Sequence, residues 1–328
     1  MKFDALNFDC LESVLEYLEL IDLLNVADST KRLKKAAELV YARKYGDKGV
    51  WLRNIRISPD RLFFIKDAST MIIEDLKTAL KLLRCVGREI SKLVMIMLLP
   101  GVFSKVNIDK LSKRDQRLFT YINDYCAEYV KNIIIYPSVC YASTLMEHFD
   151  KPFPNVHNFE HIDYDFTEKV SLNRLFPKLN SLASCHTRNS SFFSINTNHF
   201  PYLERFGFLE SSSEAMPENE MLQAFIRLNP QLKELQLRSL DFLYSHLNTD
   251  LLRNAVECLQ NIESLELDIK PITFLTDSDN IIHIKSVKNF AINFHQIYEL
   301  PECFGLINYD PNIWKITRKI SKINRTYG

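Results

Sequence analysis

The sequence predicts an α/β protein in which a small module of three helices precedes an irregular solenoid of repeats with a curved parallel sheet. Two observations lead to this class. Apolar residues recur at helical spacing in three short stretches of the first 45 residues. From about residue 130 onward, a short pattern of alternating apolar positions returns at intervals of 23 to 30 residues, which is typical of repeat proteins.

Composition excludes several classes of protein. Lys+Arg and Asp+Glu are equal at 41 each, so no net charge attracts nucleic acid or acidic membranes. No apolar run is long enough to span a bilayer, and we expect no signal segment at the start. Seven cysteines without a C-x-x-C pair argue against a disulfide framework or a zinc knuckle. Only seven glycines, none in a phosphate-binding loop or a G-x-S-x-G motif, argue against the common nucleotide enzymes and serine hydrolases. We therefore expect a reduced protein of the cytoplasm or nucleus, with no cofactor or metal.

The first helix is predicted to start at Asp9, which can cap it together with Glu12 three residues later. A second helix should start at Asp22 and a third at Ser29 or Thr30. The apolar stripes of the three are Leu11, Val14, Leu15, Leu18; Leu23, Leu24, Val26, Ala27; and Leu33, Ala36, Ala37, Val40, Tyr41. Three such short helices cannot easily bury all these faces against one another, so part of the surface needs another partner.

Charge is unevenly distributed over this module. Residues 1–30 hold seven acids against one Lys, whereas residues 31–53 hold eight bases against two acids. The simplest interpretation is a solvated face on each of two helices.

The rest of the chain repeats the pattern L-x-x-L-x-L after a Pro or polar turn, most clearly in "NPQLKELQL" (229–237) and "LQNIESLEL" (259–267). Further copies allow aromatic and β-branched residues at the Leu positions. They start at Val130, Val156, Leu179, Leu203, Leu232, Ile262, Val287 and Ile313, with an earlier one at Ile90. Leucine-rich repeats run about 20–29 residues, so nearly every interval fits. The gap of 40 residues between Ile90 and Val130 leaves room for a long helix or a further repeat.

Each repeat is predicted to form one short parallel strand followed by a returning segment. Two returns have helical periodicity, residues 220–228 and 250–259, and helices at 72–83 and 115–129 should cap the core at its N-terminal end. The residues between the Leu positions should face the concave side of the sheet, which we call the ladder face.

The segment "LNFDCLESVLEYLELIDLLNVADSTKRLKKAA" resembles an F-box, the module that docks onto the Skp adaptor of cullin-based ubiquitin ligases. It departs from the usual pattern at Asn7, at Ser29-Thr30 and at Leu33. Together with the repeats, the chain resembles the F-box/leucine-rich-repeat family. The resemblance implies an F-box-like module at 1–50 and a repeat solenoid at 51–328. It also implies a substrate-recognition subunit of an SCF-type E3 ubiquitin ligase, with the Skp adaptor, cullin and an unknown protein substrate as partners. The alternative is a non-degradative interaction scaffold whose N-terminal helices are only a cap.

Two sets of binding residues follow from this interpretation. The adaptor-binding set is Leu6, Leu11, Val14, Leu15, Leu18, Leu23 and Leu24. The target-binding set lies on the ladder face, which is mildly apolar around Ile134 and Tyr136 and charged further on; it is Tyr136, Arg205, Glu234, Arg238 and Glu266. Tyr and Arg are favoured because interfaces concentrate binding energy in such anchors.

Three weaker signals suggest other chemistry. "HNFEH" (157–161) has the spacing of a zinc hydrolase motif on a helix, although its context favours a strand. Cys185-His186 contains a thiol beside an imidazole. The basic runs Lys31–Lys35 and 314–325 could bind nucleic acid or a membrane, but exposed lysines on a helix and on a capping strand are the simpler explanation.

Overall fold

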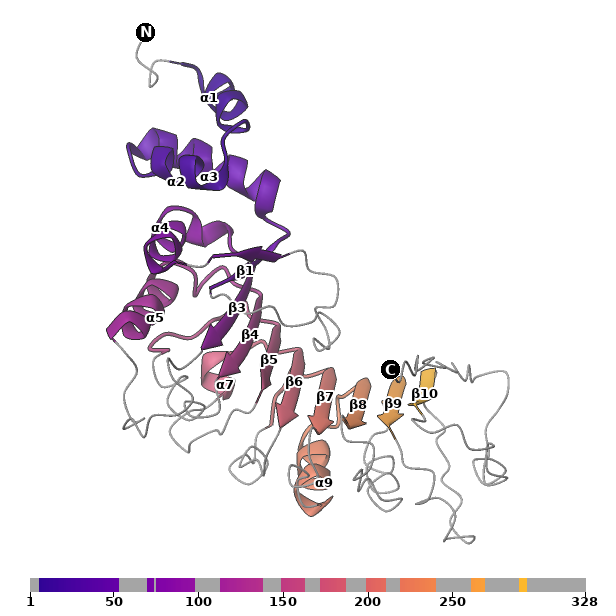
Figure 1. The fold of residues 1–328 in the computed structure, drawn as a ribbon. Coiled ribbons are helices and arrows are strands. Elements are labelled where there is room, and N and C mark those ends of the chain that lie inside the picture. Colours follow the sequence, from indigo (N-terminus) through magenta and orange to yellow (C-terminus); the bar gives the residue numbers. More distant parts are fainter. Residues whose placement is uncertain are drawn as a thin grey trace, which may run out of the picture. The chain divides into compact units, whose positions relative to one another are not determined.

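The computed structural model describes residues 6–52, 70–73, 75–97, 113–137, 149–162, 172–186, 199–210, 219–239, 261–268 and 289–293. Over these residues the protein is a mixed α/β structure (Figure 1). The chain divides into two compact units, residues 1–180 and 181–328. No helix among the described residues is long and apolar enough to cross a membrane.

The N-terminal module consists of α1 (Phe8–Leu15), α2 (Leu20–Ala27) and α3 (Lys31–Tyr45). The predicted first cap was wrong, because the side chain of Asn7 accepts the N–H of Cys10 at 2.7 Å and starts α1 before Asp9. The second helix likewise starts at Leu20, two residues before the predicted Asp22. Thr30 caps α3 as predicted, accepting the N–H of Leu33 at 3.2 Å.

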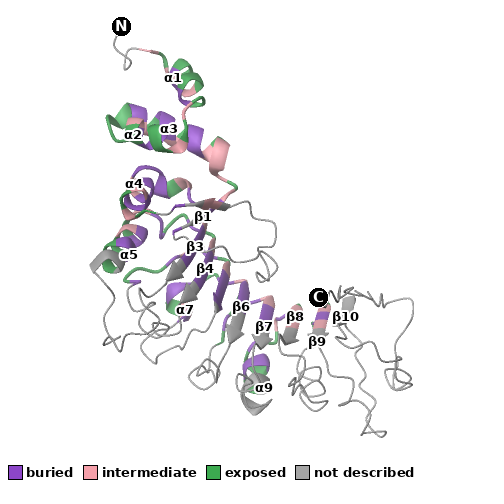
Figure 2. Ribbon diagram, viewed as in Figure 1, coloured by how far each residue is buried: buried purple, intermediate pink, exposed green. Residues whose placement is uncertain are grey.

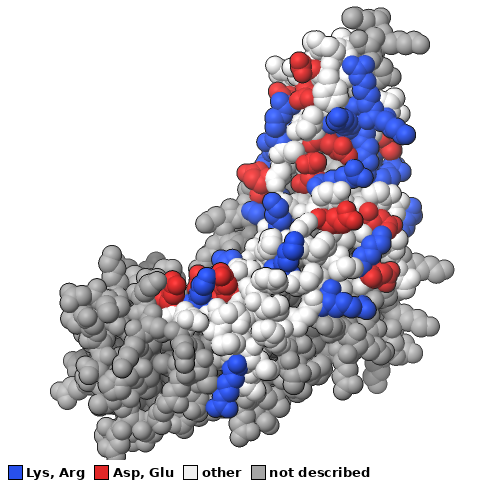
Figure 3. All heavy atoms as spheres, turned by 180° about the vertical axis from the view of Figure 1, so that it is seen from behind, with Lys and Arg blue, Asp and Glu red and all other residues white. Residues whose placement is uncertain are grey.

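The separated charges of this module partly face each other. The Arg43 guanidinium of α3 pairs with the Glu12 carboxylate and lies 3.0 Å from that of Glu16, both on or next to α1. The Lys44 ammonium donates to the carbonyl oxygens of Glu16 and Leu18, each at 2.9 Å. Figure 3 shows basic and acidic side chains interleaved over the upper part of the molecule, where these helices lie. Part of this charge therefore pairs between α3 and the end of α1, while the side chains of Arg43 and Glu16 stay 51% and 45% exposed, as the interpretation of solvated faces expects.

Unit 1 continues with five described parallel strands in the order β2-β1-β3-β4-β5. They are β1 (Gly49–Trp51), β2 (Thr70–Ile72), β3 (Lys92–Met97), β4 (Asn132–Pro137) and β5 (Asn158–Ile162). From β3 onward each strand lies beside its neighbour in sequence, as in a solenoid, but β1 lies between β2 and β3. The periodicity did not indicate β1 and β2, because three residues are too few to show an alternation.

The helices of unit 1 are α4 (Leu76–Val86), the 3₁₀ turn η3 (Gly87–Glu89), α5 (Lys113–Tyr125) and the single turn α7 (Leu172–Leu175). The helix predicted from residue 72 starts later because Asp75 caps it, accepting the N–H of Thr78 at 2.8 Å. Figure 1 shows α4 and α5 on the same side of the sheet. The 40-residue gap between Ile90 and Val130 therefore holds β3 and α5 in its described part.

Unit 2 has five described parallel strands in sequence order and the helix α9 (Asn219–Leu228). The strands are β6 (Ser181–His186), β7 (Arg205–Glu210), β8 (Glu234–Ser239), β9 (Ser264–Asp268) and β10 (Asn289–Asn293). The middle apolar positions of the repeats pair in register, Phe206 with Leu235 and Leu235 with Leu265. The predicted α/β class with open parallel sheets is confirmed, while the predicted helix at 250–259 and the repeat at Ile313 lie outside the described residues.

Side-chain amides close several repeat turns. The donor is the residue just before the first apolar position of a repeat. In each case its amide donates to a carbonyl of the preceding turn: Asn155 to Glu128 (2.6 Å), Gln231 to Phe200 and Asn261 to Pro230 (3.4 Å). These hydrogen bonds are exposed or half-buried, and they add contacts between neighbouring turns to the pairing along the strands.

Aromatic side chains fill the core between strands and helices. In unit 1, the ring centroids of the chain Phe119, Phe149, Phe153, Phe176 and Phe159 are 4.8–6.0 Å apart at each step. In unit 2, Phe225 of α9 lies 4.6 Å from Phe206 of β7. The aromatic residues that replace Leu in the pattern are therefore core residues. Figure 2 shows buried stretches along β3, β4, β6 and β7.

Tyr41 of α3 gives a testable detail of this core. Its side chain is 1% exposed and its hydroxyl has no hydrogen-bond partner within the described structure; burial raises its pKa. A buried unsatisfied hydroxyl costs roughly 1–3 kcal/mol. We expect Tyr41→Phe to leave the free energy of unfolding unchanged or to raise it by about 1 kcal/mol, as measured by urea denaturation. Tyr41→Ala should instead lower the free energy of unfolding by several kcal/mol, because it leaves a cavity in the core. A clear loss of stability in Tyr41→Phe would mean that the Tyr41 hydroxyl does have a hydrogen-bond partner.

Candidate protein-binding surfaces

The predicted adaptor-binding set divides into a buried and an exposed part. Leu11, Leu15, Leu23 and Leu24 are 0% exposed and form the module's own core, so the expectation that they contact another protein is corrected. Leu6 and Leu18 are half-buried, and Val14 is 42% exposed. Only these three of the predicted residues can be reached by a partner on the folded chain.

Two exposed apolar residues were not in the predicted set. Tyr17, in the turn after α1, is 89% exposed, and Ile21 of α2 is 46% exposed. Both lie off the helical stripe that fills the core, and this position outside the stripe is the signal that could have identified them. With Val14 they place three large apolar side chains in water within eight residues of sequence, an arrangement that favours a protein-binding surface.

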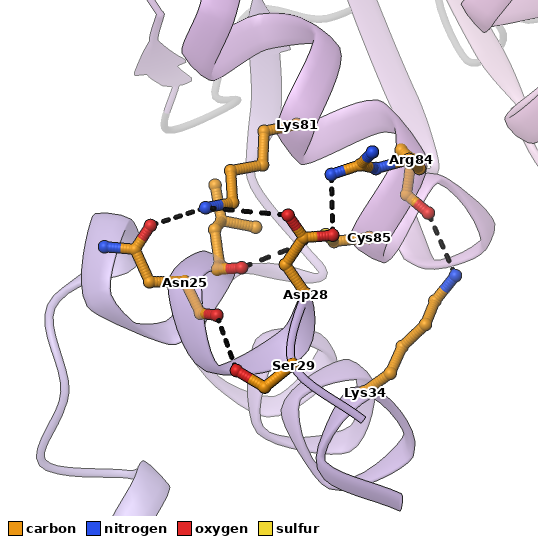
Figure 4. A network of polar contacts seen from close by, with 8 residues as sticks. Asn25, Asp28, Ser29, Lys34, Lys81, Arg84 and Cys85 are labelled. Carbon is orange, nitrogen blue, oxygen red and sulfur yellow. Dashed lines mark hydrogen bonds and ion pairs between the residues drawn. The ribbon is translucent and has the colours of Figure 1, made fainter. Parts of the chain in front are cut away.

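Polar residues of α2, of α3 and of the turn between them contact α4, the first helix after the module (Figure 4). The Asp28 carboxylate lies 2.6 Å from the Arg84 guanidinium and 4.0 Å from the Lys81 ammonium of α4. Lys81 also donates to the Asn25 side chain, and Lys34 donates to the Arg84 carbonyl at 3.0 Å. These groups are partly exposed, so the ion pairs contribute little to stability and mainly fix the orientation of α2 on α4.

Apolar residues lie beneath this polar contact. Leu24 is fully buried. Its carbonyl oxygen accepts a hydrogen bond from the thiol of Cys85 of α4 at 3.9 Å. The Cys126 thiol, which follows α5, is also buried, and this burial raises its pKa to about 12. The module therefore belongs to the same compact unit as β1–β5. The predicted boundary near residue 50 stays a prediction about independent folding.

The ladder face of unit 1 does not match the expected open surface. Ile134 of β4 is 1% exposed and Glu160 of β5 is 3% exposed, so the mildly apolar part predicted around Ile134 is covered. Tyr136 lies two residues further along β4, and its side chain is outside the described structure.

In unit 2 only some ladder positions are reachable. Ser181 and Ala183 of β6 are 0% exposed, whereas Arg205, Glu234 and Glu266 are half-buried. Arg205 and Glu234 are register partners on β7 and β8. Arg238 lies on β8 at a ladder position, with its side chain outside the described structure. The predicted charged part of the ladder is thus brought together on three adjacent strands.

The motifs that suggested other chemistry are not arranged for it. "HNFEH" enters strand β5 (Asn158–Ile162), where alternate side chains point to opposite faces, so Glu160 points away from His161. The Nδ1 atom of His157 lies 3.2 Å from the Lys178 carbonyl oxygen. Cys185 and His186 are neighbours on β6, and their side chains lie outside the described structure. No cluster of metal-ligating side chains occurs among the described residues.

The basic run of α3 is a solvated helix surface. Lys31, Arg32 and Lys35 are exposed and Lys34 is half-buried, as the sequence predicts. The second basic run, 314–325, lies outside the described residues.

No family model matches this chain, and no curated protein matches it either.

Proposed function

We propose that the protein is a substrate-recognition subunit of an SCF-type E3 ubiquitin ligase in the cytoplasm or nucleus. In this function the N-terminal module binds the Skp adaptor and, through it, cullin, while the repeats bind a target protein. The chain performs no bond chemistry; tethering raises the effective concentration of the target's lysines near a recruited conjugating enzyme.

One observation carries this proposal. Val14, Tyr17 and Ile21 are exposed although Leu11, Leu15, Leu23 and Leu24 near them in the sequence are completely buried. Single exposed apolar residues are common, but three within eight residues put an unusual amount of apolar surface in water, and this arrangement forgoes roughly 1.5–3 kcal/mol of burial for each side chain. A partner protein that covers this surface recovers that free energy.

The experiment is a binding measurement between the purified full chain and a purified Skp adaptor, followed by addition of cullin. We expect a one-to-one complex with the adaptor that then takes up cullin. If the adaptor does not bind at tens of micromolar concentration, the proposed function is wrong.

A non-degradative scaffold is the second candidate, because α2 and α3 pack on α4 as a cap would. A chain truncated to residues 47–328, which removes the three helices and keeps all of β1, distinguishes the two once its folding has been checked by circular dichroism. An F-box protein should lose adaptor binding on truncation, whereas a scaffold should show no adaptor binding with either chain and should keep its target only if the cap is present.

A further inference from the structure

The turn that carries Tyr17 is held by a side chain from α3. Tyr17 lies between α1 and α2, and its side chain is largely exposed. The Lys44 ammonium donates to the carbonyl oxygens of Glu16 and Leu18, the residues on either side of Tyr17, each at 2.9 Å. A single cation therefore bridges the backbone before and after this exposed aromatic side chain.

The position of the Lys44 ammonium is itself fixed. An ammonium has three N–H donors, and these two carbonyls use two of them. The ammonium also lies 5.6 Å from the centroid of the Tyr45 ring, within the range of a cation–π contact. The neighbouring Arg43 pairs with the carboxylates of Glu12 and Glu16. Two adjacent cations of α3 thus hold the end of α1 and the turn after it.

Hydrogen bonds within the turn are local. The N–H groups of Tyr17 and Leu18 donate to the carbonyls of Val14 and Leu15, at 3.3 and 3.1 Å. The side chain of Glu19 makes no capping hydrogen bond at the start of α2. Exposed turns with only local backbone bonds open at a low free-energy cost, so the conformation around Tyr17 depends on the contact from α3.

We propose that Lys44 is a positioning residue of the adaptor-binding surface and holds Tyr17 in the conformation in which the adaptor binds it. The inference rests on the proposed function, in which Val14, Tyr17 and Ile21 contact the adaptor. A surface that is ordered before association avoids the entropy cost of ordering it during association. Lys44 is half-buried and acts through the turn, without touching the partner.

The test is a double-mutant cycle on the full chain, with binding of the purified Skp adaptor measured by isothermal titration. Lys44→Met keeps the length of the side chain and removes its N–H donors. We expect it to weaken adaptor binding about tenfold, because the turn must then be ordered on binding. In a chain that carries Tyr17→Ala, the same substitution should have no further effect, since the side chain through which Lys44 acts is gone.

Further measurements separate positioning from a general loss of stability. Lys44→Met should lower the melting temperature by less than about 3 °C, because water can replace the ammonium at these exposed or half-buried hydrogen bonds. Amide hydrogen exchange at Tyr17 and Leu18 should become faster. Lys44→Arg, which keeps the charge and N–H donors, should restore most of the affinity. As a control, Lys31→Met changes an exposed residue about 20 Å away along α3 and should leave the affinity unchanged.

The unchanged chain separates the two proposals. If it does not bind the adaptor, the proposed function is wrong and the role of Lys44 is wrong with it. If it does bind, an unchanged affinity in Lys44→Met, or the same loss with and without the Tyr17 side chain, would overturn only the role of Lys44. A large fall in the melting temperature of Lys44→Met would also overturn it, because Lys44 would then hold the fold instead of the turn.

Discussion

Replacing Tyr17 or Ile21 with Asp is expected to weaken binding of the Skp adaptor at least about thirtyfold while the chain stays folded. Both side chains are exposed, 89% and 46%, so the substitution costs the free chain little. In the complex it would place a charge in an apolar contact, and truncating or charging a central anchor typically costs 2 kcal/mol or more. Isothermal titration with purified adaptor measures the effect.

Two control variants separate an effect on the adaptor site from a general effect of the Asp substitution. Tyr202→Asp makes the same change at a Tyr of unit 2 that is 59% exposed, and it should leave adaptor affinity unchanged. Leu15→Asp instead places a charge at a fully buried position, so it should lower the melting temperature as well as the affinity. Wild-type affinity in both the Tyr17 and the Ile21 variant would mean that the exposed surface is not the adaptor site.

Replacing Asn229 with Leu is expected to lower the free energy of unfolding by about 3 kcal/mol. Asn229 is 0% exposed and follows α9. Its Oδ1 accepts the N–H of Phe200 and its Nδ2 donates to the carbonyl of Phe225, each at 2.8 Å. Leucine has nearly the same volume but leaves both backbone groups buried without a partner, at roughly 1–3 kcal/mol each. Urea denaturation followed by circular dichroism measures the loss.

Asn261→Ala is the matched control for this second prediction. Asn261 is exposed, and its amide makes one long bond of 3.4 Å to the Pro230 carbonyl, so water can replace it. We expect a loss below about 0.5 kcal/mol, as for most surface substitutions. Equal losses in both variants would show that the buried amide of Asn229 does not have the special role that its two bonds indicate.

The repeat pattern and the helix stripes were predictable because they depend on local spacing. Core-facing residues must recur with period 2 in a strand and about 3.6 in a helix, and this period is visible in one sequence. The stripe of α3, from Leu33 to Tyr41, is buried as predicted. The strands β6–β9 likewise start where L-x-x-L-x-L places them.

The identity of the partner-facing residues was less predictable. The stripe of α1 and α2 was assigned to a partner, but four of its leucines fill the module's own core. Helical periodicity shows which residues share a face, yet it carries no information on what covers that face. The sequence places Tyr17 and Ile21 off the stripe, but only the structure shows that the stripe is buried and that these two side chains remain exposed.

The sequence by itself therefore determined the α/β class, the helical start and the repeating strands, since each follows from the period of apolar residues along a short segment. The tertiary structure decided which faces of the helices and strands are buried and which remain exposed. It buried Glu160 and Ile134 on the ladder face, left Glu234 and Glu266 reachable, and paired Arg43 with Glu12 and Asp28 with Arg84. Burial and ion pairing depend on residues brought together from distant parts of the chain, and the periodicity of a single segment does not contain that information.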